Sequence, residues 1–131
     1  MNKIDVDTIR AGEFPHRMRV RAHTFTLDAS TAAGGQDSAP GPHDLFDGAL
    51  AACKAITAMW YAKRKGIPLE RVESHVESDD SEERAGKYRM RVHVELIGPL
   101  TDEQRADVQR AIAHCPIHKL MTTTDVTIDT V

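Results

Sequence analysis

The stretch LFDGALAACKAITAMWYAKRK, residues 45–65, decides the fold of this chain. It is rich in good helix formers, three cations stand in its last turn, and Gly66 follows, which is the usual pattern of a helix C-terminus. Between residues 48 and 62 the only charge is Lys54, so the predicted helix is apolar on almost every side. Such a helix is enclosed by protein. One sheet of a chain this small cannot enclose it, and we expect a second subunit to do so.

Segments on both sides of this helix alternate between apolar and polar residues, which is typical of strands. The predicted strands are residues 3–9, 16–22, 23–29, 71–78, 88–98 and 124–131. A slip of the alternation near residues 22–24 indicates a tight turn or a bulge. Residues 30–42 are rich in Gly, Pro and Ser and are expected to form a long loop.

A second helix is predicted over residues 101–115, where Thr101 and Gln104 have the spacing of a capping box. The order of the elements is then strands, apolar helix, strands, helix and strand. This order predicts an α+β fold with a largely antiparallel sheet and a long buried central helix.

The bulk composition predicts one ordinary domain over residues 1–131. Lys and Arg total 17, Asp and Glu total 20, and the net charge is −3. There is no surplus of basic residues for binding nucleic acid. The N-terminal residues lack the apolar core of a signal peptide, and no segment approaches the roughly 18 apolar residues of a membrane span. We therefore expect a cytoplasmic protein that binds neither nucleic acid nor membranes.

The chain has two cysteines, which lie far apart in the sequence. Cys53 stands in the middle of the apolar helix, and on residue type alone it is a small core residue. Cys115 precedes Pro116, and proline is favoured at the first position of a helix. Cys115 is thus predicted at the N-cap of a short helix, where free N–H groups would lower its pKa and make the sulfur reactive.

Two separated motifs are similar to those of one known family. The segment PHDLFDGALAACKAITAMWYAKRKGI, residues 42–67, is followed by HCPIHKLM at 114–121 and VTIDT at 126–130. Together they resemble the OsmC/Ohr family of hydroperoxide-reducing proteins, from residue 42 to the end of the chain. The resemblance implies an OsmC-like intertwined homodimer whose central helices pack together between the sheets of the two subunits.

The resemblance also implies a chemistry for the two cysteines. The Cys53 thiolate would attack the O–O bond of a peroxide and become a sulfenic acid. Cys115 would condense with it to a disulfide, which an external dithiol, in this family often a lipoyl group, would reduce. No cofactor is implied. The Cα atoms of the two cysteines would have to lie within about 7 Å of each other.

This chemistry needs a positive charge near the reacting sulfur, because a thiol with an ordinary pKa of about 8.5 is only a few per cent ionised at neutral pH. Peroxide-reducing relatives supply an arginine from the N-terminal hairpin. The candidates here are Arg10, Arg17, Arg19 and Arg21. Arg17 lies nearest the predicted turn and is favoured over the others. The alternative for each of them is a solvated strand face.

In those relatives a glutamate ahead of the helix steadies the arginine. Ten residues before Cys53 this chain has His43, and Asp44 follows at nine. Asp44 would keep a carboxylate in the neighbourhood, or it is a helix-start residue that favours the helix dipole. His43 is a possible substitute hydrogen-bond partner.

Other candidate residues concern metals and the substrate pocket. Cys115 and His118 have ligand-like spacing, but a structural zinc site uses four ligands and no second pair matches, so we expect no metal. His114 and His118 flank Cys115 as surface residues that could tune its pKa. Loop 30–42 would border the pocket. Its expected apolar lining is Phe46, Met59 and Trp60.

The leading interpretation is a thiol-dependent peroxidase that acts on organic or other small hydroperoxides at the dimer interface. Two other interpretations stay open. One is a non-catalytic OsmC-like dimer that binds a small apolar ligand in the same cavity, which the absence of the clamp glutamate favours. The other is a dimeric structural domain with two idle thiols.

Overall fold

The computed structural model describes all 131 residues, which form two compact units, residues 1–46 and 47–131. The boundary falls within the long helix α1 (Pro42–Lys65). The fold is α+β with antiparallel strand pairs, as the sequence predicts, but the strands form two separate sheets. That the chain is a single domain stays a prediction.

The N-terminal unit contains a three-stranded antiparallel sheet in the order β1 (Ile4–Thr8), β2 (His16–Val20) and β3 (His23–Leu27). Val20 pairs with His23 across a two-residue turn, in which Arg21 has a φ of 52°. This turn explains the slip in the alternation, because it places the apolar residues of β2 and β3 on the same face. The predicted turn is confirmed.

The loop after β3 is organised around one buried carboxylate. Asp28 accepts hydrogen bonds from the Ser38 hydroxyl at 2.6 Å and from the amides of Ser38, Ala29 and Gln36 at 3.0, 2.7 and 3.3 Å. These bonds, led by the one from the Ser38 hydroxyl, lower the pKa of Asp28 to about 2. The loop is therefore ordered, and it contains a short 3₁₀ helix, η1 (Thr31–Ala33).

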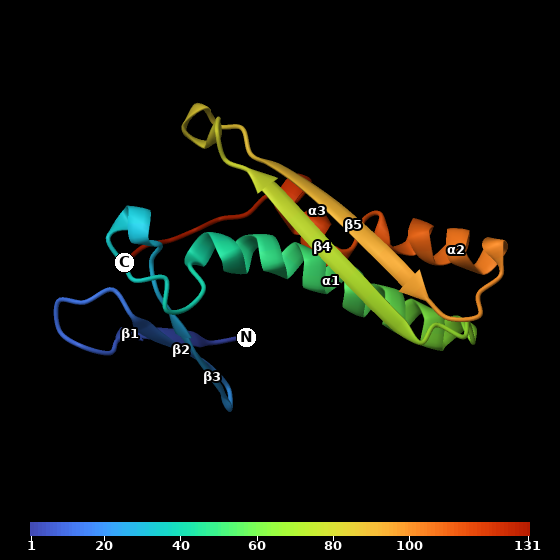
Figure 1. The fold of residues 1–131 in the computed structure, drawn as a ribbon, viewed down its shortest axis with the longest axis horizontal. Coiled ribbons are helices and arrows are strands. Elements are labelled where there is room, and N and C mark those ends of the chain that lie inside the picture. Colours follow the sequence, from blue (N-terminus) through green and yellow to red (C-terminus); the bar gives the residue numbers. More distant parts are fainter. The chain divides into compact units, whose positions relative to one another are not determined.

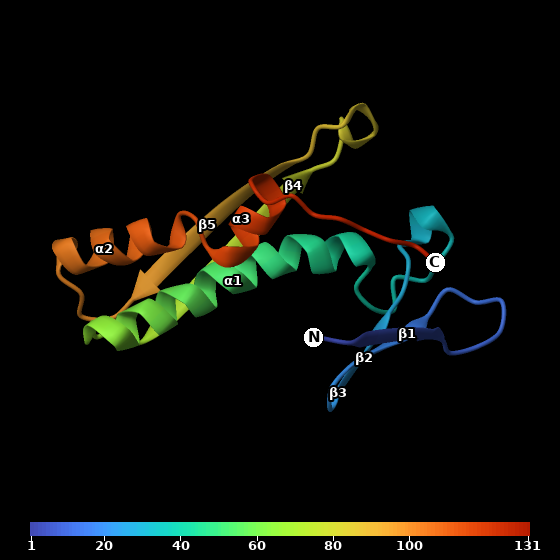
Figure 2. The ribbon, with the colours of Figure 1, turned by 180° about the vertical axis from the view of Figure 1, so that it is seen from behind.

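The C-terminal unit packs helices against a hairpin. The hairpin is β4 (Arg71–Asp79) and β5 (Arg89–Ile97), with the 3₁₀ helix η2 (Glu83–Ala85) at its tip, and the helices are α1, α2 (Asp102–Ile112) and α3 (Pro116–Thr122). Helices α1, α2 and α3 lie on one face of the hairpin (Figures 1 and 2). The buried core between them consists of Ala58, Ala62, Ile67, Leu69, Leu96, Val108 and Ile112.

The helix ends follow the sequence signals. Gly66 has a φ of 66° and lets the amide of Ile67 turn back to the carbonyl of Ala62 at 2.9 Å, which closes the end of α1. Ile67 and Ala62 both belong to the buried core. At the start of α2, both hydrogen bonds of the Thr101–Gln104 capping box are present. The predicted caps are confirmed.

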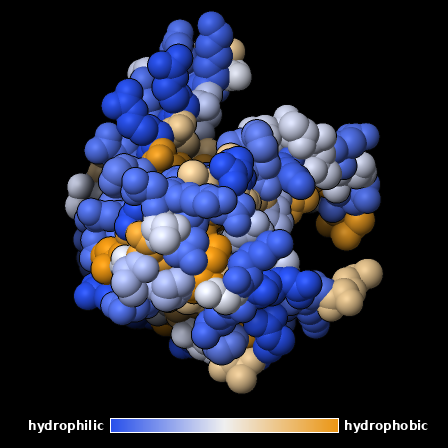
Figure 3. Space-filling model, turned by 90° about the vertical axis from the view of Figure 1, so that its right-hand side faces the viewer, coloured by the Kyte–Doolittle hydropathy of each residue, from blue (hydrophilic) through white to orange (hydrophobic).

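One side of α1 is covered within the chain and the other is not. Its buried residues Leu50, Lys54, Ala58 and Ala62 recur every four positions and form one stripe. By contrast Ile56 is 70% exposed and Trp60 is 57% exposed. Hydrophobic patches of this kind interrupt a mostly hydrophilic surface (Figure 3). Enclosure of the remaining side by a second subunit stays a prediction.

One predicted helix boundary and one predicted strand are wrong. Helix α1 begins at Pro42 instead of Leu45, because proline fits the first position of a helix. Residues 124–131 form no strand, since no strand of the chain pairs with them. Alternation predicts which face of a segment is apolar, but a strand also needs a neighbouring backbone with which to bond.

Candidate functional site

The two cysteines lie on different elements of the C-terminal unit. Cys53 is in the middle of α1, and Cys115 is the N-cap residue of α3, directly before Pro116. Both are free thiols, but their exposure differs: Cys53 is half-buried, whereas Cys115 is only 1% exposed. The prediction of a short helix with Cys115 at its N-cap is confirmed.

The fold brings these two thiols together. The Cys115 thiol interacts with the Cys53 thiol, and this interaction raises the pKa of Cys115. The amide of Ile117, two residues after Cys115, donates a hydrogen bond to Cys53 Sγ at 3.5 Å. On the other side, Cys53 Sγ lies 3.8 Å from the Thr57 hydroxyl. Two thiols that interact in this way can exchange a proton, and oxidation can join them.

The sequence-based expectation for the pKa of Cys115 is wrong in sign. Burial is the largest effect on this thiol and raises its pKa, and the neighbouring Cys53 raises it further. The charge of Lys54 and the amide of His118 act in the opposite direction but do not reverse the shift. An N-cap position lowers the pKa of a thiol only where desolvation does not outweigh the helix dipole. Cys115 at rest is therefore a protonated, buried thiol.

Lys54 is the residue that sequence reasoning missed. Although it is a lysine, it is only 7% exposed. Its Nζ donates to the carbonyl oxygens of Ile112 at 2.8 Å and Ala113 at 3.3 Å, and it lies 3.3 Å from Nδ1 of His118. The sequence does mark this residue, because Lys54 is the only charge on an otherwise apolar stretch of the helix.

His118 faces this ammonium group. Burial, followed by the charges of Lys54 and His114, lowers the pKa of His118, so its imidazole is neutral at pH 7. Because a protonated lysine can only donate, Nδ1 of His118 accepts, and the ring hydrogen is on Nε2. The His114 ring meets the His118 ring edge-on, with centroids 5.3 Å apart. His118 is thus partly buried and not a plain surface residue.

The four candidate arginines all lie in the N-terminal unit. Three of them have partners there: Arg10 with Glu13 at 2.7 Å, Arg19 with Asp7 at 3.0 Å, and Arg21 with Asn2 at 3.3 Å. Arg17, on β2, makes no such side-chain contact and is partly buried. Arg17 is therefore the arginine whose charge is not already engaged within this unit. Its role toward Cys53 stays a prediction.

His43 and Asp44 both lie in the first turn of α1. The Asp44 carboxylate accepts a hydrogen bond from the Gly41 amide at 2.8 Å, which is the contact of a helix-start residue. His43 is exposed. The proposed participation of either residue in a clamp stays a prediction.

The residues expected to line the substrate pocket differ in their surroundings. Met59 is partly buried and packs against the core. Trp60 is exposed, with the Arg64 guanidinium 5.1 Å from its ring centroid. Phe46 is also exposed. The lining role of these three residues stays a prediction.

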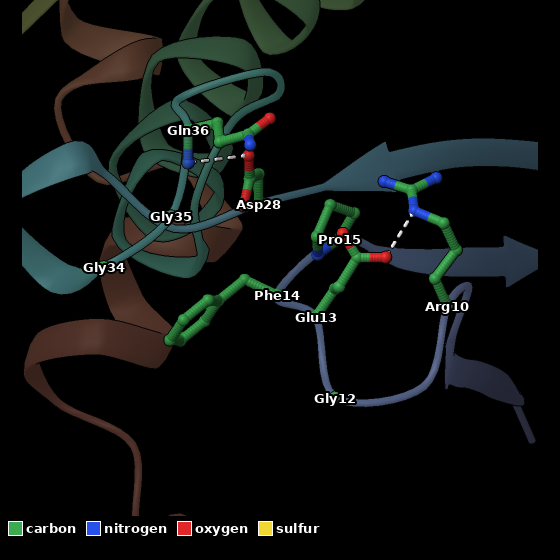
Figure 4. A pocket seen from close by; sticks show the side chains of 9 residues that line it. All are labelled: Arg10, Gly12, Glu13, Phe14, Pro15, Asp28, Gly34, Gly35 and Gln36. Atoms are coloured by element: carbon green, nitrogen blue, oxygen red, sulfur yellow. Dashed lines mark hydrogen bonds and ion pairs between the residues drawn. The ribbon is translucent and has the colours of Figure 1, made fainter.

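The N-terminal unit has a small hollow of its own (Figure 4). It measures about 250 Å³ and lies beside Arg10, Glu13, Phe14 and Asp28. Arg10 and Glu13 form an ion pair, and the Asp28 carboxylate accepts hydrogen bonds from the loop, so these side chains already have partners. Elsewhere, the structure contains no cluster of three or more His, Cys, Asp or Glu side chains that could hold a metal ion. None of its helices has the length and apolar character that crossing a bilayer requires.

Residues 35–131 match the OsmC-like protein family. The chain belongs to this family. A comparison with curated protein sequences found no match.

Solved structures of OsmC-like proteins have the same fold as this OsmC-like chain. A Psychrobacter arcticus protein, described provisionally as an osmotic stress induced and detoxification response protein, is 18% identical with a TM-score of 0.77, over 94% of this chain and 90% of that one. An OsmC-like protein from Mycoplasma pneumoniae is 20% identical with a TM-score of 0.75, over 94% and 88%. The organic hydroperoxide resistance protein OsmC from Legionella pneumophila is 22% identical with a TM-score of 0.62, over 94% and 90%.

Proposed function

We propose that this OsmC-like protein is a cytoplasmic thiol-dependent peroxidase that reduces organic or other small hydroperoxides. The observation that carries the proposal is the interaction between two free thiols, Cys53 and Cys115, which are 62 residues apart in the sequence. The half-exposed thiol can react with an external oxidant, and the buried thiol beside it can then form a disulfide with the oxidised sulfur. Structural neighbours that are named organic hydroperoxide resistance proteins share the fold and point to this substrate class.

In the first step the Cys53 thiolate attacks one oxygen of the hydroperoxide. An S–O bond forms, the O–O bond breaks, and the other oxygen leaves as an alkoxide that takes up a proton to become an alcohol. Sulfur loses two electrons to the peroxide and becomes a sulfenic acid. The Ile117 amide, which donates to Cys53 Sγ at 3.5 Å, supports negative charge on the attacking sulfur.

In the second step the Cys115 sulfur attacks the oxidised Cys53 sulfur. An S–S bond forms, the S–O bond breaks, and hydroxide leaves and takes up the Cys115 proton as water. An external dithiol, of the lipoyl type that this family often uses, then exchanges with the disulfide and is itself oxidised to a disulfide. Both protein thiols are restored, so the cycle consumes one hydroperoxide and one dithiol.

The proposed enzyme is an intertwined homodimer. The exposed side of α1, with Ile56 and Trp60, is an apolar surface of the kind that a second subunit covers. Arg17 is proposed as the cation for Cys53, with Asp44 or His43 in place of the family's glutamate. Phe46, Met59 and Trp60 are proposed to line the substrate pocket.

Counting thiols tests the proposal. One equivalent of cumene hydroperoxide is added to the fully reduced protein, and free thiols are measured before and after. A peroxidase loses both thiols and releases one equivalent of cumyl alcohol. Retention of both thiols would refute it.

The second candidate is a non-catalytic OsmC-like dimer that binds a small apolar ligand. The observation that favours it is His43, which stands where peroxide-reducing relatives carry a glutamate. Such a protein keeps both thiols in the same experiment. It would still shift the fluorescence of Trp60, the only tryptophan, when an apolar ligand binds.

A further inference from the structure

We propose that Lys54 is a positioning residue that holds Cys115 against Cys53 and supplies the positive charge for closing the disulfide between them. This inference rests on the proposed function. It gives a role in closing the disulfide to a residue other than Arg17 and Asp44.

Burial of Lys54 needs an explanation, because lysine is almost never buried unless it is paired. Removing an ammonium group from water costs several kcal/mol unless its hydrogen bonds are replaced. Lys54 has three donor hydrogens and three acceptors around it: the carbonyls of Ile112 and Ala113, and Nδ1 of His118. The surrounding structure is therefore built for a charged lysine.

These acceptors lie on both sides of Cys115 in the sequence. Ile112 and Ala113 are three and two residues before it, at the C-terminus of α2, where carbonyl groups lack partners and a positive charge is favoured. His118 is three residues after it, in α3. Lys54 therefore fixes the turn that carries Cys115 onto α1, at the position next to Cys53.

The same ammonium acts on the chemistry of Cys115. To attack the sulfenic acid, the Cys115 thiol must lose its proton, which burial opposes. The charge of Lys54 lowers the pKa of Cys115 against that effect. The other titratable groups around Cys115 in this unit are Cys53 on α1 and His114 and His118 on its own segment. His118 is neutral at pH 7, and Lys54 is the cation whose charge lowers the pKa of Cys115.

The main experiment compares Lys54→Met with Lys63→Met. Methionine keeps the length of the side chain but removes its charge and its donors. Lys63 is an exposed lysine on the same helix and serves as the matched control. Reduced protein is mixed with cumene hydroperoxide, and sulfenic acid and disulfide are followed separately. We expect Lys54→Met to close the disulfide about tenfold more slowly, because the Cys115 thiol loses a neighbouring positive charge, and to accumulate sulfenic acid that dimedone traps. Lys63→Met should behave as the wild type does.

A pH profile separates the charge of Lys54 from a merely structural role. In a Cys53→Ser background, the rate of Cys115 alkylation is measured against pH. Loss of the charge moves the ionisation of Cys115 to higher pH. Simple loosening of the turn would hydrate Cys115 and move its ionisation to lower pH, which would overturn the electrostatic part of the proposal.

Two substitutions of His118 provide an independent test if Lys54→Met folds poorly. Asparagine at position 118 offers an oxygen acceptor close to the place of Nδ1, whereas leucine offers none. We expect His118→Asn to retain most of the closure rate and His118→Leu to lose it. Equal rates in both variants, or unchanged closure in Lys54→Met, would overturn the proposal.

Failure of the proposed function gives a different result. If the wild type does not react with hydroperoxide, the peroxidase proposal fails. Closure driven by diamide, a general thiol oxidant, and the alkylation profile still measure what Lys54 does to the thiol pair.

Discussion

The middle of α1 and the turn between α2 and α3 each carry one cysteine, and the two environments differ sharply. Around Cys53 the helix is partly open, and an amide and a hydroxyl face the sulfur. Around Cys115 the chain is closed, with only 1% of the residue exposed and its pKa raised by burial. The two thiols nevertheless interact with each other. The difference supports the proposed roles, in which the open thiol reacts with the external oxidant and the closed thiol forms the disulfide.

The comparison is also informative because the local residue pattern around each cysteine indicates the reverse. An alanine-rich helix favours an inert, buried cysteine, and a Cys-Pro turn favours a reactive one. In the structure, one face of the helix is open, whereas Cys115 is buried and its turn is tied to α1 by Lys54. The reactivity of a thiol depends on what packs against it, which a local motif does not specify.

The largest effects are expected when the sulfur of each cysteine is replaced by oxygen, which tests whether the two thiols have different roles. Cys53→Ser should abolish hydroperoxide consumption, a loss of about 10³-fold or more, because the nucleophile is gone. Cys115→Ser should instead allow one turnover and leave a trappable sulfenic acid on Cys53. Mass spectrometry of dimedone adducts distinguishes the two variants. Equal residual activity in both would mean that the thiols have no separate roles.

Alkylation of the native, reduced protein should show how much the reactivities of the two thiols differ. We expect iodoacetamide to modify Cys53 at least about tenfold faster than Cys115, because reaction needs an accessible thiolate and Cys115 is buried and protonated. Peptide mapping after short exposures measures both rates. In mild denaturant the two rates should converge, and faster labelling of Cys115 in the native state would contradict the assignment.

Removing the proposed cation tests whether the two thiols depend on different charges. Arg17→Gln should slow sulfenic acid formation at Cys53 about tenfold, as expected for losing a charge near a reacting thiolate, and leave disulfide closure unchanged. Arg19→Gln is the matched control, because Arg19 is on the same strand and is already paired with Asp7. Identical effects of the two substitutions would exclude a specific role for Arg17.

The smallest expected effect is a pH dependence of stability at the Cys115 turn. The pKa of His118 is lowered from 6.5 in the folded protein, so the folded state binds a proton less readily than the unfolded chain does. Stability contributed by this group is complete above pH 6.5 and is lost as the pH falls through the lowered value. Urea unfolding between pH 7.5 and 5 should show this loss in the wild type, and His118→Asn should reduce it. An unchanged pH dependence in that variant would place its origin elsewhere.

Local sequence predicts much of the fold. Hydrophobic alternation predicts the five strands that form, and Gly66 and the Thr101–Gln104 box predict helix ends, because each depends on residues within one turn or one strand. The pairing of Cys53 with Cys115 came from resemblance to a family and not from spacing. The buried Lys54 was visible only as an isolated charge, since its acceptors lie 58 to 64 residues away.

Apart from residues 124–131, the order and type of the elements were determined by the sequence alone, as was the N-cap position of Cys115. Tertiary structure decided which thiol is open, which sign the pKa shift of Cys115 takes, and that a lysine lies inside the fold. It also decided that residues 124–131 stay unpaired within one chain. The physical reason is that desolvation and charge act through whatever surrounds a group in space, and packing brings those surroundings from distant parts of the sequence.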